Sequence, residues 1–135
     1  LTGYISIDFK IYNKSIEILD INPRLSGSYR LYTRKYNNLM SNHMMLSNTL
    51  DIKSMHYHSY IILYAKNDIK VDDKIQTLPD VSDIPDIGDV IKKDMPIITL
   101  NIKADNQDDL YKIIKRRIKS AMKIIDCYNT QLEYE

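Results

Sequence analysis

Two short runs rich in β-branched and aromatic residues lie near the start of the chain and constrain its fold more than any other feature. The first covers residues 4–12 and the second residues 16–19. Asn13-Lys14-Ser15 between them predicts a hairpin turn. If the two runs pair antiparallel, Asp8 in the first and Asp20 just after the second approach each other at the same end of the hairpin. The sequence therefore predicts a β-hairpin that carries two carboxylates at one end.

The segment after the second run combines a carboxylate, an amide oxygen and a guanidinium within five residues, and it reads Asp20-Ile21-Asn22-Pro23-Arg24-Leu25-Ser26-Gly27-Ser28. Asp20 and Asn22 are two apart, so they share a face of an extended strand. Mg²⁺ takes oxygen ligands, usually one or two carboxylates together with phosphates and waters, so Asp8, Asp20 and Asn22 are candidate ligands. Arg24 offers a planar, permanently charged fork suited to phosphate. The same spacing also fits a polar hairpin end that closes on an ordinary Asx-Pro turn.

This segment resembles the metal-binding signature of the ATP-grasp superfamily, usually Glu-x-Asn-Pro-Arg-x-Ser, and residues 3–9 resemble the strand that precedes it. The resemblance implies that ATP and Mg²⁺ are cofactors, with Mn²⁺ as an alternative ion. It implies that the magnesium ligands are Asp8, Asp20 and Asn22. It also implies that Arg24 faces the transferring phosphoryl group, beside a loop shaped by Ser26, Gly27 and Ser28. Position 20 departs from the signature, because Asp stands where the family usually has Glu; this leaves the number of bound metal ions open.

A second block, residues 84–91 and 95–100, resembles the tail of one ATP-grasp branch, roughly Asp-Ile-Pro-x-x-Gly-x-x-Ile-x-x-Gly-x-Pro-Ile-x-Thr. Members of that branch look like archaeal cofactor-biosynthesis ligases, such as tyramine–glutamate ligase of methanofuran biosynthesis. Asp94 stands where the pattern has its second Gly. The two blocks together cover about a third of the chain.

The resemblance implies an ATP-dependent ligase. ATP converts a carboxylate to an acyl phosphate, an amine displaces phosphate, and an amide forms. The partners would be small-molecule carboxylate and amine substrates. Arg30 or Arg34, which alternate with tyrosines after the motif, could hold a substrate carboxylate while the tyrosines stack on a ring. The sequence contains no Gly-rich phosphate loop. We therefore expect a C-terminal fragment that needs the N-terminal half of the same protein and is inactive alone.

The length of the chain indicates one small domain. The chain has 135 residues, 44% of them hydrophobic, and a net charge of +1; such a balance argues against a surface that coats nucleic acid. No run is long enough to span a membrane. One cysteine, Cys127, cannot form an internal disulfide and suits a reducing compartment, so we expect a cytoplasmic protein.

The rest of the chain predicts an α+β fold, a small, mainly antiparallel sheet packed with helices, which the resemblance implies is the C-terminal portion of an ATP-grasp fold. Residues 1–30 would form the metal and phosphate hairpin and loop, and residues 55–127 the strands plus a C-terminal helix. The expected strands are residues 56–65 and 95–103, separated by Asp- and Pro-rich loops over residues 71–88.

Two helices are expected. Residues 106–127 carry an apolar stripe at helical spacing, with Asp105 as the N-cap and Asp108 near the capping-box position. A thinner stripe, made by Leu31, Lys35 and Leu39, predicts one helix earlier in the chain.

Other readings compete with the ligase. In a non-catalytic α+β binding module, the opening motif is only a turn and Asp8 and Asp20 point apart. A nucleic-acid module would use Arg116 and Arg117, and His56 with His58 on one strand face could bind zinc; a solvated helix face and ordinary histidines are favoured over both. An exposed sheet edge could also pair with a neighbour in a homo-oligomer.

Overall fold

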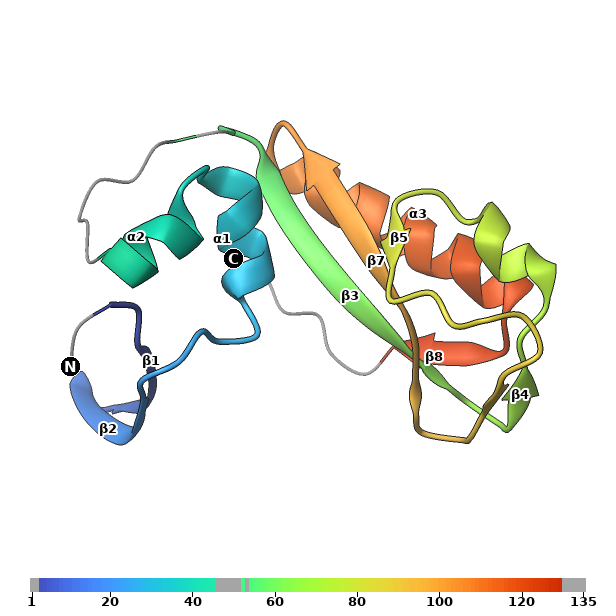
Figure 1. The fold of residues 1–135 in the computed structure, drawn as a ribbon, viewed down its shortest axis with the longest axis horizontal. Helices are drawn as coiled ribbons and strands as arrows, with labels where there is room; N and C mark the ends of the chain where they lie inside the picture. The colour runs from blue at the N-terminus through green and yellow to red at the C-terminus, as the bar shows by residue number, and fades with distance from the viewer. Residues whose placement is uncertain (1–2, 46–51, 53, 130–135) are drawn as a thin grey trace. The chain divides into compact units, whose positions relative to one another are not determined.

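The computed structural model describes residues 3–45, 52 and 54–129. The chain forms two compact units, Leu1–Met55 and His56–Glu135 (Figure 1). Within the described residues, α-helices and antiparallel strand pairs lie in separate stretches of the chain, so the predicted α+β class is confirmed. None of the described helices is long and apolar enough to cross a membrane.

The first unit opens with the predicted hairpin. Strand β1 (Ser6–Tyr12) pairs antiparallel with β2 (Ser15–Asn22). The two turn residues, Asn13 and Lys14, have φ values of 48° and 64°. Positive φ at both central positions is the requirement of a type I′ turn, whose twist matches that of the paired strands.

Two short helices follow, where the sequence predicted one. Helix α1 (Tyr29–Lys35) is followed by its C-cap, Tyr36, which is extended and donates its N–H to the Tyr32 carbonyl at 2.8 Å. Helix α2 (Leu39–Met45) begins after Asn37 and Asn38. Leu31 and Leu39 are both buried, but on separate helices. The prediction of a continuous helix was wrong because asparagine favours turns and caps over helix interiors.

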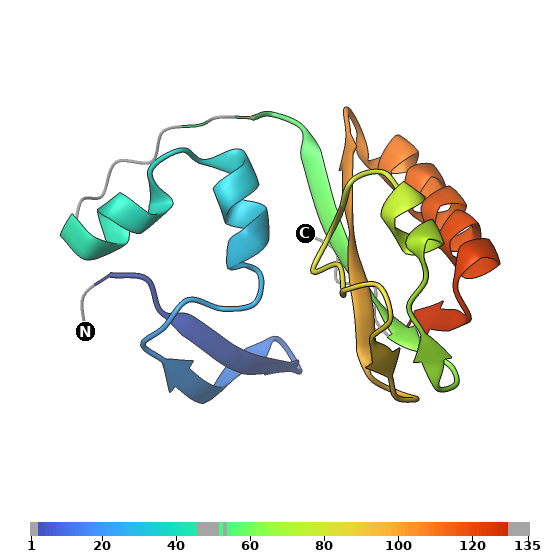
Figure 2. The same cartoon turned by 45° about the vertical axis from the view of Figure 1, so that its right-hand side comes forward.

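The second unit is a four-stranded antiparallel sheet with the order β5–β7–β3–β8. The long central strands are β3 (Tyr57–Ala65) and β7 (Pro96–Ala104), and the edges are β5 (Val81–Ser82) and β8 (Cys127–Asn129). Helix α3 (Gln107–Ile124) covers one face of this sheet (Figures 1 and 2). The core between helix and sheet includes Ile61, Leu63, Ile98, Leu100, Leu110 and Ile114. Both predicted strands are therefore confirmed, and they pair with each other.

The segment between β3 and β7 is mostly loop, as its Asp and Pro content predicted. It also contains the short strands β4 (Ile69–Lys70) and β6 (Val90–Ile91), which pair with each other, and a 3₁₀ turn, η1 (Asp73–Thr77). Asp94, in the position where the resembled pattern has Gly, has a φ of 67° and donates its N–H to the Ala65 carbonyl at 2.8 Å. This turn therefore has the left-handed conformation that glycine adopts most easily.

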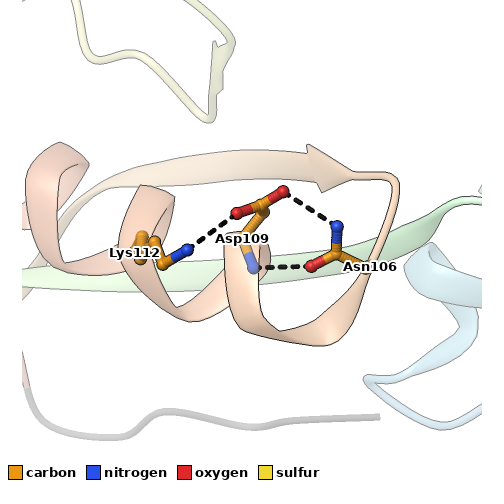
Figure 3. Close-up of polar contacts among 3 residues, drawn as sticks. All are labelled: Asn106, Asp109 and Lys112. Carbon is orange, nitrogen blue, oxygen red and sulfur yellow. Dashed lines mark hydrogen bonds and ion pairs between the residues drawn. The ribbon is translucent and has the colours of Figure 1, made fainter.

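Helix α3 differs from its prediction at both ends. Its N-cap is Asn106, not Asp105: Asn106 Oδ1 accepts the Asp109 N–H at 2.9 Å, and Asn106 Nδ2 donates to the Asp109 carboxylate at 2.8 Å (Figure 3). The partner in this box is thus Asp109, and not Asp108. The helix ends at Ile124, and Cys127, which was predicted to be its last residue, is instead the first residue of β8.

Candidate functional site

The hairpin brings the two predicted carboxylates together through an irregularity in its register. The strands pair regularly from the turn to Phe9 and Ile18. The next residue of β2, Leu19, has no pairing partner in β1 and forms a bulge. Beyond this bulge Asp8 pairs with Asp20, and Ser6 pairs with Asn22. Directly paired residues lie on the same face of an antiparallel ladder. Asp8, Asp20 and Asn22 therefore share one face of the hairpin.

The opposite face of the hairpin is apolar. Its cross-strand pairs are Ile7 with Ile21, Phe9 with Ile18 and Ile11 with Ile16. These side chains are exposed within the described chain. The polar face, with the two carboxylates and the amide, is thus separated from the apolar face by the alternation of the strands.

The oxygens of Asp20 are already oriented by its neighbours. One carboxylate oxygen accepts the Ile21 N–H at 2.9 Å, and the other accepts the Asn22 side-chain N–H at 2.9 Å. Because Asn22 donates through its amide nitrogen, its carbonyl oxygen keeps its capacity as a ligand. The three predicted ligands are consequently a cluster of two carboxylates and one amide carbonyl.

This cluster fits a hard divalent cation. Two carboxylates placed directly opposite each other repel, and an oxygen-seeking cation removes that repulsion. The described chain contains no group of three or more His, Cys, Asp or Glu side chains that could hold a metal ion. Mg²⁺ often takes only a few ligands from the protein, because phosphates and waters supply the others. Two carboxylates and an amide fit such a site.

The chain turns sharply after the cluster. The Arg24 N–H donates to the Asn22 carbonyl at 2.8 Å, across Pro23, and this closes a three-residue turn. The Arg24 guanidinium makes one weak contact, at 3.4 Å, with the Leu25 carbonyl, and no ion pair to a carboxylate of the described residues. The hydroxyls of Ser26 and Ser28 are hydrogen-bonded to each other at 2.7 Å. The turn therefore places a guanidinium with little internal engagement just after the carboxylate pair in the chain.

A cavity of about 280 Å³, here called the tyrosine cavity, adjoins this turn. Arg24, Leu25 and Ser26 form part of its wall, with Ile5 and Leu39. The rest of the wall is aromatic: Tyr4, Tyr29, Tyr32 and Tyr36. Three of these tyrosines follow helical spacing along α1 and its C-cap, which brings their side chains to one side of the helix.

His43, for which the sequence predicted no site, supports one wall of the tyrosine cavity. Its Nδ1 accepts the Tyr4 N–H at 2.9 Å, and its ring stacks on the Tyr4 ring at 5.7 Å between centroids. Gly3, with a φ of 91°, lets the chain pass this ring, because a Cβ there would lie 2.8 Å from His43 Nδ1. The one signal in the sequence is a glycine just before a strand.

The two arginines proposed for the substrate, Arg30 and Arg34, do not line this cavity. Both are exposed, and they lie four residues apart on α1, a spacing that places them together on another side of the helix from the cavity tyrosines. Arg24 and Ser26 therefore line the same cavity as the tyrosines, whereas Arg30 and Arg34 lie outside it.

The alternative sites lie in the second unit. His56 Nδ1 is 2.6 Å from the Asp105 carboxylate, so its ring is engaged by an acid rather than joined with His58 in a metal cluster. An open depression of about 570 Å³ beside them mixes both charges, since its polar wall comprises His56, Lys103, Asp105, Asp109, Lys112 and Arg116. Arg117 donates to the Pro79 carbonyl and is mostly buried, so it belongs to the internal packing rather than to a basic surface.

Comparison of the chain with protein-family models, with curated proteins and with solved structures gave no match.

Proposed function

We propose that this chain is the C-terminal part of a cytoplasmic ATP-grasp ligase that joins a carboxylate to an amine. The observation that carries the proposal is the pairing of Asp8 with Asp20 across the bulge, with Asn22 on the same face and Arg24 directly after it. The order of the residues resembles the superfamily signature, with Asp20 in place of the usual Glu. The pattern of residues 84–100 supports the narrower assignment to the branch of tyramine–glutamate ligase and its role in cofactor biosynthesis.

The chain's own residues would hold and orient the reactants. Asp8, Asp20 and Asn22 would hold Mg²⁺, or Mn²⁺, on the nucleotide phosphates. When bound, Mg²⁺–ATP supplies the phosphoryl group that activates the carboxylate as an acyl phosphate, from which an amine displaces phosphate. Arg24 would stabilise the negative charge on the transferring group, and Ser26, Gly27 and Ser28 would shape the loop beside it.

Paramagnetic broadening by Mn²⁺ tests the metal assignment in this chain without requiring turnover. In a ¹⁵N–¹H spectrum, substoichiometric Mn²⁺ should broaden the amides of Asp8, Asp20 and Asn22 before those of the hairpin turn. Asp8→Asn and Asn22→Ala should reduce this broadening. Glu17→Gln is the matched control, because Glu17 is another exposed carboxylate on the same hairpin, paired with Lys10.

The test separates the proposal from its alternative. Equal broadening along the whole hairpin, or broadening that persists in both Asp8→Asn and Asn22→Ala, would remove the metal role and leave a non-catalytic α+β module. In the protein extended by its upstream half, Asn22→Ala should strongly reduce ATP-dependent amide formation while the fold is kept.

A further inference from the structure

The wall of the tyrosine cavity has an uneven chemistry. It consists of four phenol rings, three aliphatic side chains, one serine and one arginine. Among the described residues that line it, Arg24 is the one charged residue, and none carries a carboxylate. An apolar body and a single anionic end are therefore the features of a ligand that this wall complements.

The size of the cavity limits the ligand. A cavity of roughly 150 Å³ lined by apolar side chains holds a benzene molecule. The tyrosine cavity, at about 280 Å³, accommodates one ring together with a short chain, and it lies near the lower end of the range for small-molecule sites. Stacking on tyrosine faces favours a planar ring over a flexible chain of equal volume.

We propose that the tyrosine cavity binds the carboxylate substrate, and that this substrate is a compact acid with a single ring, whose carboxylate lies against Arg24. The inference rests on the proposed function for its reaction, but it departs from the substrates in the name tyramine–glutamate ligase, where the amine carries the ring. In that reaction a carboxylate oxygen attacks the γ-phosphorus of ATP, the bond from that phosphorus to the bridging oxygen breaks, and ADP leaves. The substrate carboxylate and the γ-phosphate must then lie close together, where one guanidinium can contact both. Arg24 meets this requirement, because it lines the cavity and also lies in the turn that follows Asn22.

An amine is disfavoured in the same cavity. Its ammonium would gain cation–π contact with the tyrosine faces. It would meet no carboxylate among the described residues of the wall, however, and it would lie near a second cation, the guanidinium. Like charges brought together in a partly dehydrated site repel more strongly than in water. The cavity thus favours an acid over an amine by charge as well as by shape. The amine substrate would therefore bind in another part of the protein.

His43 makes the cavity a built site rather than a gap between side chains. Its hydrogen bond and ring stack fix Tyr4 from outside the wall, through an Nδ1 that carries no proton. His43→Asn can keep an acceptor for the Tyr4 N–H, whereas His43→Leu cannot. His43 is thus a positioning residue, which acts on the ligand through Tyr4.

Three probes with the same ring and the same single-carbon linker test the charge preference: phenylacetate, benzylamine and benzyl alcohol. Titration of the full chain, followed by ¹⁵N–¹H shifts of Arg24, Tyr29 and Tyr32, should show phenylacetate binding about tenfold more tightly than benzylamine. Arg24→Gln should abolish that difference, and Tyr32→Leu should weaken all three probes. Lys10→Gln, which removes an exposed cation from the hairpin, should change nothing.

His43→Leu should weaken phenylacetate binding severalfold, and His43→Asn should restore it. Amides of β1 and β2 report whether the first unit, which contains the substituted residues, still folds in each variant. Benzylamine binding as tightly as phenylacetate, a preference unchanged by Arg24→Gln, or no shift with any probe at about 10 mM would each overturn the inference. Mn²⁺ broadening needs none of these probes. If the chain binds phenylacetate but shows no localised Mn²⁺ broadening, the metal proposal is wrong. If Mn²⁺ broadening is localised but phenylacetate does not bind, only this inference is wrong.

Discussion

Removal of the Asn106 side chain tests the best-defined polar contact of the second unit. Asn106→Ala deletes the acceptor of the Asp109 N–H and the donor to the Asp109 carboxylate (Figure 3). The loss of an N-cap of this kind costs about 1 kcal/mol, within a range of roughly 0.5–2 kcal/mol. Helix α3 contributes the buried residues Leu110, Ile114 and Ala121 to the core, so fraying of its first turn is coupled to unfolding of the sheet it covers.

Urea unfolding followed by circular dichroism measures this cost. For a unit of this size the dependence of the unfolding free energy on urea is about 1–2 kcal/mol per molar, so the midpoint should fall by about 0.5–1 M. Asn106→Ser retains a capping oxygen and should lose much less. Asp105→Ala is the decisive comparison, because Asp105 is the N-cap that the sequence predicts and its contact with His56 is largely exposed. A larger loss from Asp105→Ala than from Asn106→Ala would refute the capping argument.

The same variant has a pH signature. The hydrogen bond from Asn106, followed by that from Lys112, lowers the pKa of Asp109 below its ordinary value of 3.8. A lowered pKa means that the folded state favours the carboxylate, so its contribution is present above the ordinary pKa and is lost as pH falls through the folded pKa. In Asn106→Ala the Asp109 pKa should rise toward 3.8, and ¹³C titration of its carboxyl group measures this shift.

Two further predictions concern the sheet unit. Asp94→Gly should be more stable than Asp94→Ala by about 1 kcal/mol, because the φ of 67° there strains any residue with a Cβ; equal urea midpoints for the two variants would contradict this reading of the turn. Cys127 is buried, and burial, with a smaller effect of Asp126, raises the pKa of its thiol to about 11. Its alkylation by iodoacetamide at pH 8 should therefore be slow in the folded chain and fast in urea, whereas rapid labelling of the folded chain would show an accessible thiolate.

The strands and the last helix could be predicted because their patterns extend over many residues. β3 is rich in aromatic and aliphatic residues, β7 is rich in β-branched residues, and α3 carries an apolar stripe over 18 residues. Strand β8 could not be predicted, since three residues carry no periodicity and Cys127–Asn129 pairs with Leu63–Ala65 only after the rest of the sheet exists. The tyrosine cavity could not be predicted either, because its wall combines the segment before β1, the turn at Arg24–Ser26 and both short helices of the first unit.

Only part of the hairpin site could be predicted from the spacing of its residues. A spacing of two places Asp20 and Asn22 on one face, but it does not decide whether Asp8 joins them. The two-residue turn pairs Tyr12 with Ser15, and that register, continued without interruption, would pair Asp8 with Leu19. Asp20 would then lie opposite Ile7, on the apolar face.

The bulge at Leu19 reverses this outcome. It brings Ile21 opposite Ile7 on the apolar face and Asp20 opposite Asp8 on the polar face. A shift of one residue exchanges the two faces of a strand. Apolar cross-strand pairs are more favourable than an aspartate opposite Ile7, so the bulged register is the more stable one. The isoleucines therefore pair on one face, and the same register places the two carboxylates and the amide on the other. The bulge at Leu19 is what makes this register possible.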